Sequence, residues 1–234
     1  MPSSTWVESK KQAEKVEKTK ALLAWIKENR ETFWGGVAIT AAVVAFVIFF
    51  TASYSKLQKN AWQALFMAQQ HSYSGNTEEG RKIIDNIVKN YSRSSAVPFA
   101  LMLQADLDFA KGNYEEAEKT YTQAMKKADK ELVPVLMFNI AKTYEARHNW
   151  DETIKAYRDF LKKYPGHYTA PEVHTNLAVI LSRAGKDAES KAAFERIIVI
   201  YPDTAWAEQA KKILNPPAEE PAKSVKQDGR KAKK

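Results

Sequence analysis

The residue types that carry most enzyme chemistry are sparse in this 234-residue chain and follow no catalytic pattern. The four histidines, His71, His148, His167 and His174, are scattered, and none belongs to an HExxH or similarly spaced metal motif. Cysteine is absent, which excludes disulfides, thiol nucleophiles, cysteine-bound zinc and cysteine-linked lipid. The chain has no phosphate-binding glycine loop and no Gly-x-Ser-x-Gly motif. The sequence therefore predicts a protein that is not an enzyme and holds no metal or cofactor.

The paired acidic residues stand where local structure explains them. Three asparagines each precede a glutamate by three positions, the spacing of a capping box: Asn76 with Glu79, Asn113 with Glu116, and Asn149 with Glu152. An acid in the first turn also complements the positive end of the helix dipole. These signals predict helix starts and not acid–base catalysis.

The predicted helices repeat along the chain. Gly75, Gly112, His148 and Gly185 recur at spacings of 37, 36 and 37 residues. A small residue stands seven positions before each of them: Ala68, Ala105, Ala141 and Ala178. The small residue lets two antiparallel helices approach, and the turn residue accepts a left-handed backbone. After each of the last three turns, a small residue precedes an aromatic one by four: Ala117 with Tyr121, Thr153 with Tyr157, and Ser190 with Phe194.

This pattern resembles the tetratricopeptide repeat, with tyrosine–proline pairs at 164–165 and 201–202 closing the third and fourth units. The first unit fits least well, because Gly80 and Ile84 stand at its small and aromatic positions. We therefore predict an all-α chain whose domain at 55–214 is an α-solenoid of about four helix pairs, at about 61–94, 98–131, 134–167 and 171–204, with a capping helix at 204–214. The resemblance implies a right-handed superhelix with a concave inner surface.

An uncharged stretch precedes the repeats. Residues 33–54 contain no Asp, Glu, Lys, Arg or His, and a helix over them would be about 33 Å long, enough to cross a bilayer. A buried core helix or a cleaved signal peptide is the alternative, but 32 residues precede the stretch and it is longer than a signal core. Five basic residues lie at 13–32 and two at 55–74, which predicts a cytoplasmic N-terminus and a repeat domain on the far side, periplasmic in a bacterium.

The chain ends differ from the domain between them. For residues 1–32 we expect a helix along the cytoplasmic membrane face that runs into the span, its first part loosely ordered; a solvated tail is the alternative for residues 1–12. Residues 215–234 are poor in apolar residues and rich in lysine, so we expect a disordered basic tail. The net charge of +8 is spread over both ends and the repeats, and no predicted folded segment is basic enough to indicate nucleic-acid binding.

The predicted binding surface is the concave wall made by the first helix of each unit. The tetratricopeptide resemblance places sixteen residues there: Trp62, Leu65, Gln69 and Tyr73; Phe99, Met102, Asp106 and Phe109; Val135, Phe138, Lys142 and Glu145; and Glu172, Thr175, Val179 and Arg183. Apolar and aromatic residues dominate the first two units, which suits an extended or helical apolar segment of another protein. The alternative for any one of these side chains is packing between adjacent units.

From residue 21 to 214 the chain also resembles the single-span tetratricopeptide-repeat proteins of the bacterial envelope, typified by the ancillary subunit of the Sec translocon. That resemblance implies a bacterial inner-membrane protein whose periplasmic domain docks beside the SecYEG channel and cooperates with a membrane-anchored chaperone to receive emerging chains. We therefore expect a non-enzymatic scaffold that binds partner or unfolded polypeptides. The alternatives are an envelope-assembly or cell-division adaptor, whose basic tail touches anionic lipid or peptidoglycan, and a regulatory subunit of another complex.

Overall fold

The computed structural model describes residues 4–216, and over that range the chain is helical, without a strand. The helices are α1 (Ser4–Glu28), α2 (Arg30–Tyr73), α3 (Thr77–Asn90), α4 (Val97–Ala110), α5 (Tyr114–Met125), α6 (Val133–Ala146), α7 (Trp150–Lys163), α8 (Ala170–Arg183), α9 (Asp187–Ile200) and α10 (Ala205–Leu214). The chain divides into two compact units, one ending at Asn60 and one beginning at Ala61. The predicted all-α class is confirmed, while the tail predicted at 215–234 lies, from residue 217 onward, outside the described residues.

The N-terminal unit holds α1 and the first part of α2. Residues 4–12 are helical within α1, in place of the loosely ordered stretch or solvated tail that the sequence predicts. A turn at Asn29 separates the two helices, so α1 does not run unbroken into α2. The side-chain amide of Asn29 donates to the carbonyl oxygen of Trp25 at 3.1 Å. Within the described residues, α2 is the helix long and apolar enough to cross a membrane, and its most apolar window is not buried by the protein.

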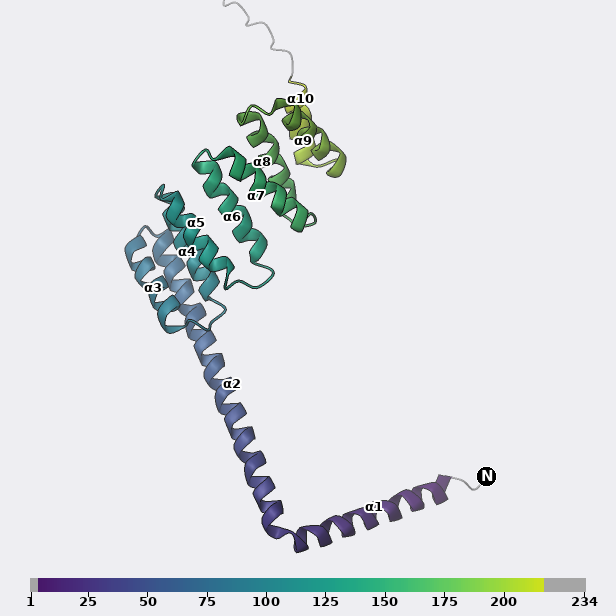
Figure 1. Cartoon of the computed structure of the whole chain (residues 1–234). Coiled ribbons are helices and arrows are strands. Elements are labelled where there is room, and N and C mark those ends of the chain that lie inside the picture. The colour runs from purple at the N-terminus through teal and green to yellow at the C-terminus, as the bar shows by residue number, and fades with distance from the viewer. Residues whose placement is uncertain (1–3, 217–234) are drawn as a thin grey trace, which may run out of the picture. The chain divides into compact units, whose positions relative to one another are not determined.

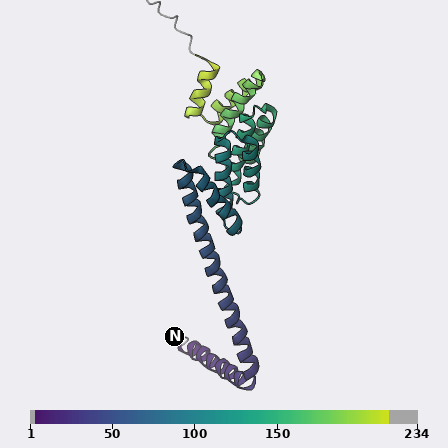
Figure 2. The same cartoon turned by 90° about the vertical axis from the view of Figure 1, so that its left-hand side faces the viewer.

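In the second unit, helices pair and stack in chain order. Contacts join α3 to α4, α4 to α5, and so on to α9 and α10, and Figure 1 shows α4 to α9 as neighbouring antiparallel helices. Figure 2 shows the same stack from the side. The helices α4, α6 and α8 each carry proline at their second residue, where its missing N–H would have no helical partner: Pro98, Pro134 and Pro171.

The turns within the pairs have the predicted left-handed backbone. The φ angles are +88° at Gly75, +82° at Gly112, +59° at His148 and +73° at Gly185. After α4 the backbone N–H of Asn113 bonds to the carbonyl of Asp108 at 2.9 Å, and the corresponding bonds follow α6 and α8. This is the Schellman arrangement, which satisfies carbonyls at the end of the first helix. His148 therefore performs the role of a turn glycine.

The helix starts after these turns differ from the prediction in one respect. Asn76, Asn113 and Asn149 are the N-cap residues, but none of their side chains makes a capping hydrogen bond. A bonding N-cap has an extended backbone, whereas these residues have ψ angles of 60–75°. For Asn113 and Asn149 the reason is the Schellman bond, which ties their N–H groups to the preceding helix. Thr204 has the extended backbone, and its hydroxyl accepts from Ala207 N at 3.3 Å.

Small residues let the helices of each pair approach. The predicted contact residues Ala68, Ala105, Ala141 and Ala178 are all 0% exposed. In the first pair a Cβ on Gly80 would lie only 2.4 Å from Ser72 Oγ and 3.1 Å from the carbonyl oxygen of Ala68. The glycine is thus required by close approach of α2 and α3, and unit one belongs to the repeat.

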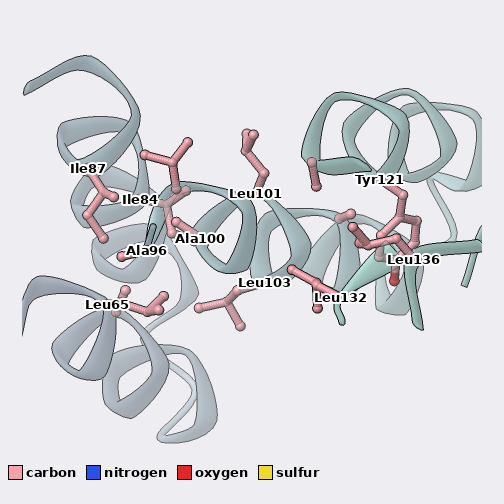
Figure 3. Packing of buried hydrophobic residues seen from close by; sticks show 14 of the residues in the cluster. Leu65, Ile84, Ile87, Ala96, Ala100, Leu101, Leu103, Tyr121, Leu132 and Leu136 are labelled. Atoms are coloured by element: carbon pink, nitrogen blue, oxygen red, sulfur yellow. The ribbon is translucent and has the colours of Figure 1, made fainter. Parts of the chain in front are cut away.

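The core continues between pairs. Figure 3 shows Leu65 of α2 and Ile84 of α3 beside Ala100 of α4, and Tyr121 of α5 beside Leu136 of α6. A second cluster centres on Tyr157, Phe160 and Ile180, and a third joins Phe194 to Ala210 of α10. Because each cluster is shared by successive helices, no pair has a complete core alone.

Candidate partner-binding surface

The residues predicted to bind a partner lie on α2 beyond residue 61 and on α4, α6 and α8, the first helices of the pairs. Three of the sixteen are buried core residues, which corrects the prediction: Leu65 is 2% exposed, Phe138 9% and Thr175 8%. Leu65 belongs to the core cluster of α2, α3 and α4, and the Phe138 ring packs 6.2 Å from the ring of Tyr157. These side chains hold pairs together and are closed to a partner.

The remaining members are exposed or half-exposed, and we call them the first-helix wall: Trp62, Gln69, Tyr73, Phe99, Met102, Asp106, Phe109, Val135, Lys142, Glu145, Glu172, Val179 and Arg183. These side chains differ in how far they are accessible to a partner. Five apolar members are half-buried against the core, as the packing alternative predicts: Phe99, Met102, Phe109, Val135 and Val179. Tyr73, at the end of α2, is 83% exposed.

An aromatic pair forms one end of the first-helix wall. The rings of Trp62 and Phe99 lie 5.2 Å apart between centroids, and they join α2 to α4. The indole N–H of Trp62 donates to Ser95 Oγ at 3.2 Å, which fixes the ring. Trp62 is still 42% exposed, and half-buried Met102 lies one helical turn beyond Phe99. A fixed, partly open aromatic ring beside a flexible thioether provides apolar contact area at little cost in conformational entropy.

The other end of the first-helix wall is ionic. Arg183 of α8 approaches Glu145 of α6, with 3.5 Å between Nη1 and Oε1. The buried Tyr157 hydroxyl donates to Glu145 Oε2 at 2.8 Å and orients the carboxylate. Burial, together with the Glu145 charge, raises the pKa of Tyr157, so this hydroxyl remains a donor at neutral pH. Between the two ends of the first-helix wall, the hydroxyl of Tyr121 donates to the carboxylate of Asp106. Lys142 Nζ lies 5.6 Å from the centroid of the Phe138 ring.

Charged pairs between neighbouring units were missed by the sequence analysis. The side chain of Asp108 is 8% exposed, and its carboxylate accepts from Arg81 of the preceding unit at 2.7 Å. A cation next to each turn residue reaches an acid in the first turn of the preceding unit's second helix: Lys111 to Glu78 at 3.2 Å, Arg147 to Glu115 at 4.0 Å, and Lys186 to Asp151 at 3.2 Å. Their recurrence at 32–35 residues is the signal that could have revealed them.

Over residues 4–216 no group of three or more His, Asp or Glu side chains could hold a metal ion. His148 has a structural role at its turn and packs against Trp150, with 5.0 Å between ring centroids. His167 is bound to Thr169, with 2.8 Å from Nδ1 to Oγ1. The first-helix wall offers apolar contact at one end and fixed charges at the other, an arrangement suited to binding a polypeptide.

Antiparallel helix pairs that stack only on their neighbours define an α-solenoid. The family model described as "Tetratricopeptide repeat-like domain" matches residues 23–199, and the chain belongs to this family. Domains of this kind are typically non-enzymatic scaffolds that bind protein partners.

Solved structures share this fold at low sequence identity. A structure of nearly identical TPR-like repeats, from a protein of Podosopora anserina named after kinesin light chain, has a TM-score of 0.54, 13% identity, and 67% coverage of this chain and 84% of its own. A tetratricopeptide repeat protein from Parabacteroides merdae has a TM-score of 0.54 and 15% identity, with 70% of this chain and 59% of its own covered. No curated protein matches in sequence. The structural likenesses establish the fold and nothing finer.

Proposed function

We propose that this protein is a membrane-anchored scaffold whose first-helix wall binds partner or unfolded polypeptides on the extracytoplasmic side of a bacterial inner membrane. The observation that carries the binding proposal is the Trp62–Phe99 pair, a fixed aromatic contact that remains partly exposed. Such rings are typical centres of protein interfaces. The family defined above supports the scaffold role, since its repeats bind through extended surfaces.

Two features support the anchor. The family match begins at residue 23 and therefore includes the apolar stretch of α2. In that helix Phe46 and Phe49 are 66% and 73% exposed, which is costly in water and favourable in lipid. We propose a single span with the N-terminus in the cytoplasm, on the strength of the basic residues before the span. We expect the protein to stay in the membrane during alkaline extraction. We also expect a protease to reach the repeats only after the outer membrane has been permeabilised.

The finer proposal places this scaffold beside the Sec translocon, where it would work with a membrane-anchored chaperone during protein export. Its support is the combination of one span and a tetratricopeptide-like domain. Photocrosslinking from position 62 in intact membranes, with mass-spectrometric identification of the partner, tests it directly. Translocon or chaperone subunits crosslinked there are the supporting result. Crosslinks exclusively to unrelated envelope proteins would contradict it.

Charge substitutions test the first-helix wall itself. W62E and F99E should each weaken crosslinking and co-purification of the partner at least tenfold, because they place a charge in an apolar contact. The matched control is Y168E, at an aromatic residue that is 77% exposed in the loop between α7 and α8, outside the wall. If a folded W62E/F99E variant binds the partner as well as Y168E does, the first-helix wall is not the binding site.

An envelope-assembly adaptor is a second candidate, favoured by six basic against three acidic residues at 215–234. Deleting residues 217–234 should leave partner binding intact if the first-helix wall carries the function. Lost localisation with unchanged binding in the same variant would support the adaptor.

A further inference from the structure

The last second helix, α9, departs from the pattern of the second helices before it. Polar pairs close the helices α3 and α7 and directly follow α5: Lys89-Asn90, Lys162-Lys163 and Lys126-Lys127. At the corresponding positions α9 carries Val199 and Ile200, which are 78% and 41% exposed. This one helix therefore ends in apolar residues that its own packing leaves uncovered, largely at Val199 and in part at Ile200.

A cavity of about 630 Å³ adjoins this end of α9, between α7 and α9, and we call it the outer groove. Leu177 and Leu181 of α8 line it together with Ile200. Ala192 and Ala193 of α9 also line it, and their short side chains leave the space open. Its volume lies within the range of ligand pockets, and its lining is largely apolar. The groove shares no residue with the first-helix wall.

Basic side chains border the apolar lining. Arg158, Lys162 and Arg196 line the outer groove with a single acidic residue, Glu189. Glu189 pairs with Arg158 at 2.6 Å, but both side chains are more than half exposed, so the pair is weak. Among the described residues, neither Lys162 nor Arg196 has a carboxylate within ion-pair distance. The groove thus presents two cations that no carboxylate in the described part of the chain pairs with.

Tyr201 also lines the outer groove. Its hydroxyl is buried and has no hydrogen-bond partner within residues 4–216, although buried polar groups are nearly always bonded. His174 stacks edge-on against the Tyr201 ring, with 5.8 Å between ring centroids. Burial, and secondarily the charge of Arg196, lowers the pKa of His174, so the imidazole is neutral at pH 7 and leaves the positive charge to Lys162 and Arg196.

We propose that the outer groove binds an acidic, apolar peptide segment of a partner protein, with its apolar side chains on Leu177, Leu181 and Ile200 and its carboxylates at Lys162 and Arg196. Charge complementarity selects this occupant, because a basic or neutral segment would leave both cations unmatched. The segment would also cover the exposed end of α9. This site is independent of the first-helix wall, so the scaffold could hold two polypeptides at once.

A defined probe tests the proposal with the full chain in nanodiscs of zwitterionic lipid. The probe is a fluorescein-labelled amphipathic helix with leucine on one face and glutamate on the other, and its binding is measured by fluorescence anisotropy against empty nanodiscs. We expect saturable binding that weakens at least tenfold in K162E/R196E and in A192W, which fills the groove from an exposed position. The matched control is K126E/K127E, the same charge change at the equivalent end of α5, which should bind the probe as the unaltered chain does.

Three outcomes would overturn the proposal. Binding that is unchanged in both K162E/R196E and A192W places the probe elsewhere. Equal weakening by K126E/K127E shows attraction to overall charge and not to the groove. Binding that appears only after deletion of residues 217–234 makes the chain's own tail, with Glu219 and Glu220, the occupant in place of a partner.

Discussion

The Arg81–Asp108 pair makes a sharp test of how neighbouring units are held together. Asp108 is almost fully buried and Arg81 is 20% exposed in its side chain, with 2.7 Å between the bonded atoms. Removing one partner of a buried pair costs about 3–5 kcal/mol, because the other charge is left without compensation. Arg81 keeps some access to water, so we expect D108A to lower the free energy of unfolding by about 3 kcal/mol, the low end of that range.

The matched control joins the same two units at the surface. Lys111 and Glu78 lie 3.2 Å apart, with side chains 44% and 76% exposed. Since exposed pairs contribute about 0–1 kcal/mol, E78A should be nearly neutral. Replacing both buried charges in R81M/D108L should restore most of the stability lost in D108A, because no charge is then left unpaired.

Urea unfolding of the full chain in detergent, followed by circular dichroism, measures these differences. Hydrogen exchange then locates them, and D108A should accelerate exchange in α3 before α8. Equal losses in D108A and E78A would refute the reasoning. A double variant R81M/D108L no more stable than D108A would refute it as well, because the cost would then come from packing and not from charge.

Further predictions concern single residues. The free energy of unfolding should decline as pH falls below about 6.5, because the folded-state pKa of His174 is lowered and the unfolded chain therefore binds the proton first. The variant H174Q should show a smaller decline. Unfolding measured at pH 7 and at pH 5 checks this. Thermal unfolding should show a loss of about 1 kcal/mol for T204A, whose hydroxyl accepts a capping bond, and less than about 0.5 for N113A, whose side chain makes none. By the same measurement, G112A should lower the free energy of unfolding by about 1 kcal/mol. The space for a Cβ is open, so the loss comes from the left-handed backbone, whose φ is +82°. An unchanged unfolding midpoint would contradict the assigned turn.

Much of the fold could be predicted because its signals are local. The left-handed turns at Gly112 and His148, and the buried alanines seven residues earlier, are where the repeat spacing places them. A helix pair needs a small residue at its crossing and a turn residue at its end, and both requirements act at a fixed distance along the chain.

The predictions that failed concern features that are not local, because they depend on how the units stack. Sequence spacing assigns Leu65 and Phe138 to a helix face but does not say whether the next helix covers that face, and both are covered. Asn113 is the N-cap residue, but its backbone also closes the preceding helix and cannot adopt the extended form. The bond between Arg81 and Asp108 spans 27 residues, too far for any helical period to indicate.

The nearest-neighbour stacking has a consequence for how the domain forms. From α3 to α10 the contacts join successive helices, with α8 and α10 the added pair, so residues that meet lie close in the chain. Such low contact order is typical of domains that fold within microseconds to milliseconds. Each pair gains its packing surface from the pair before it, so α4 and α5 have a partner as soon as they follow α3. A chain threaded through a pore one end first would therefore gain structure step by step, without waiting for its last helix.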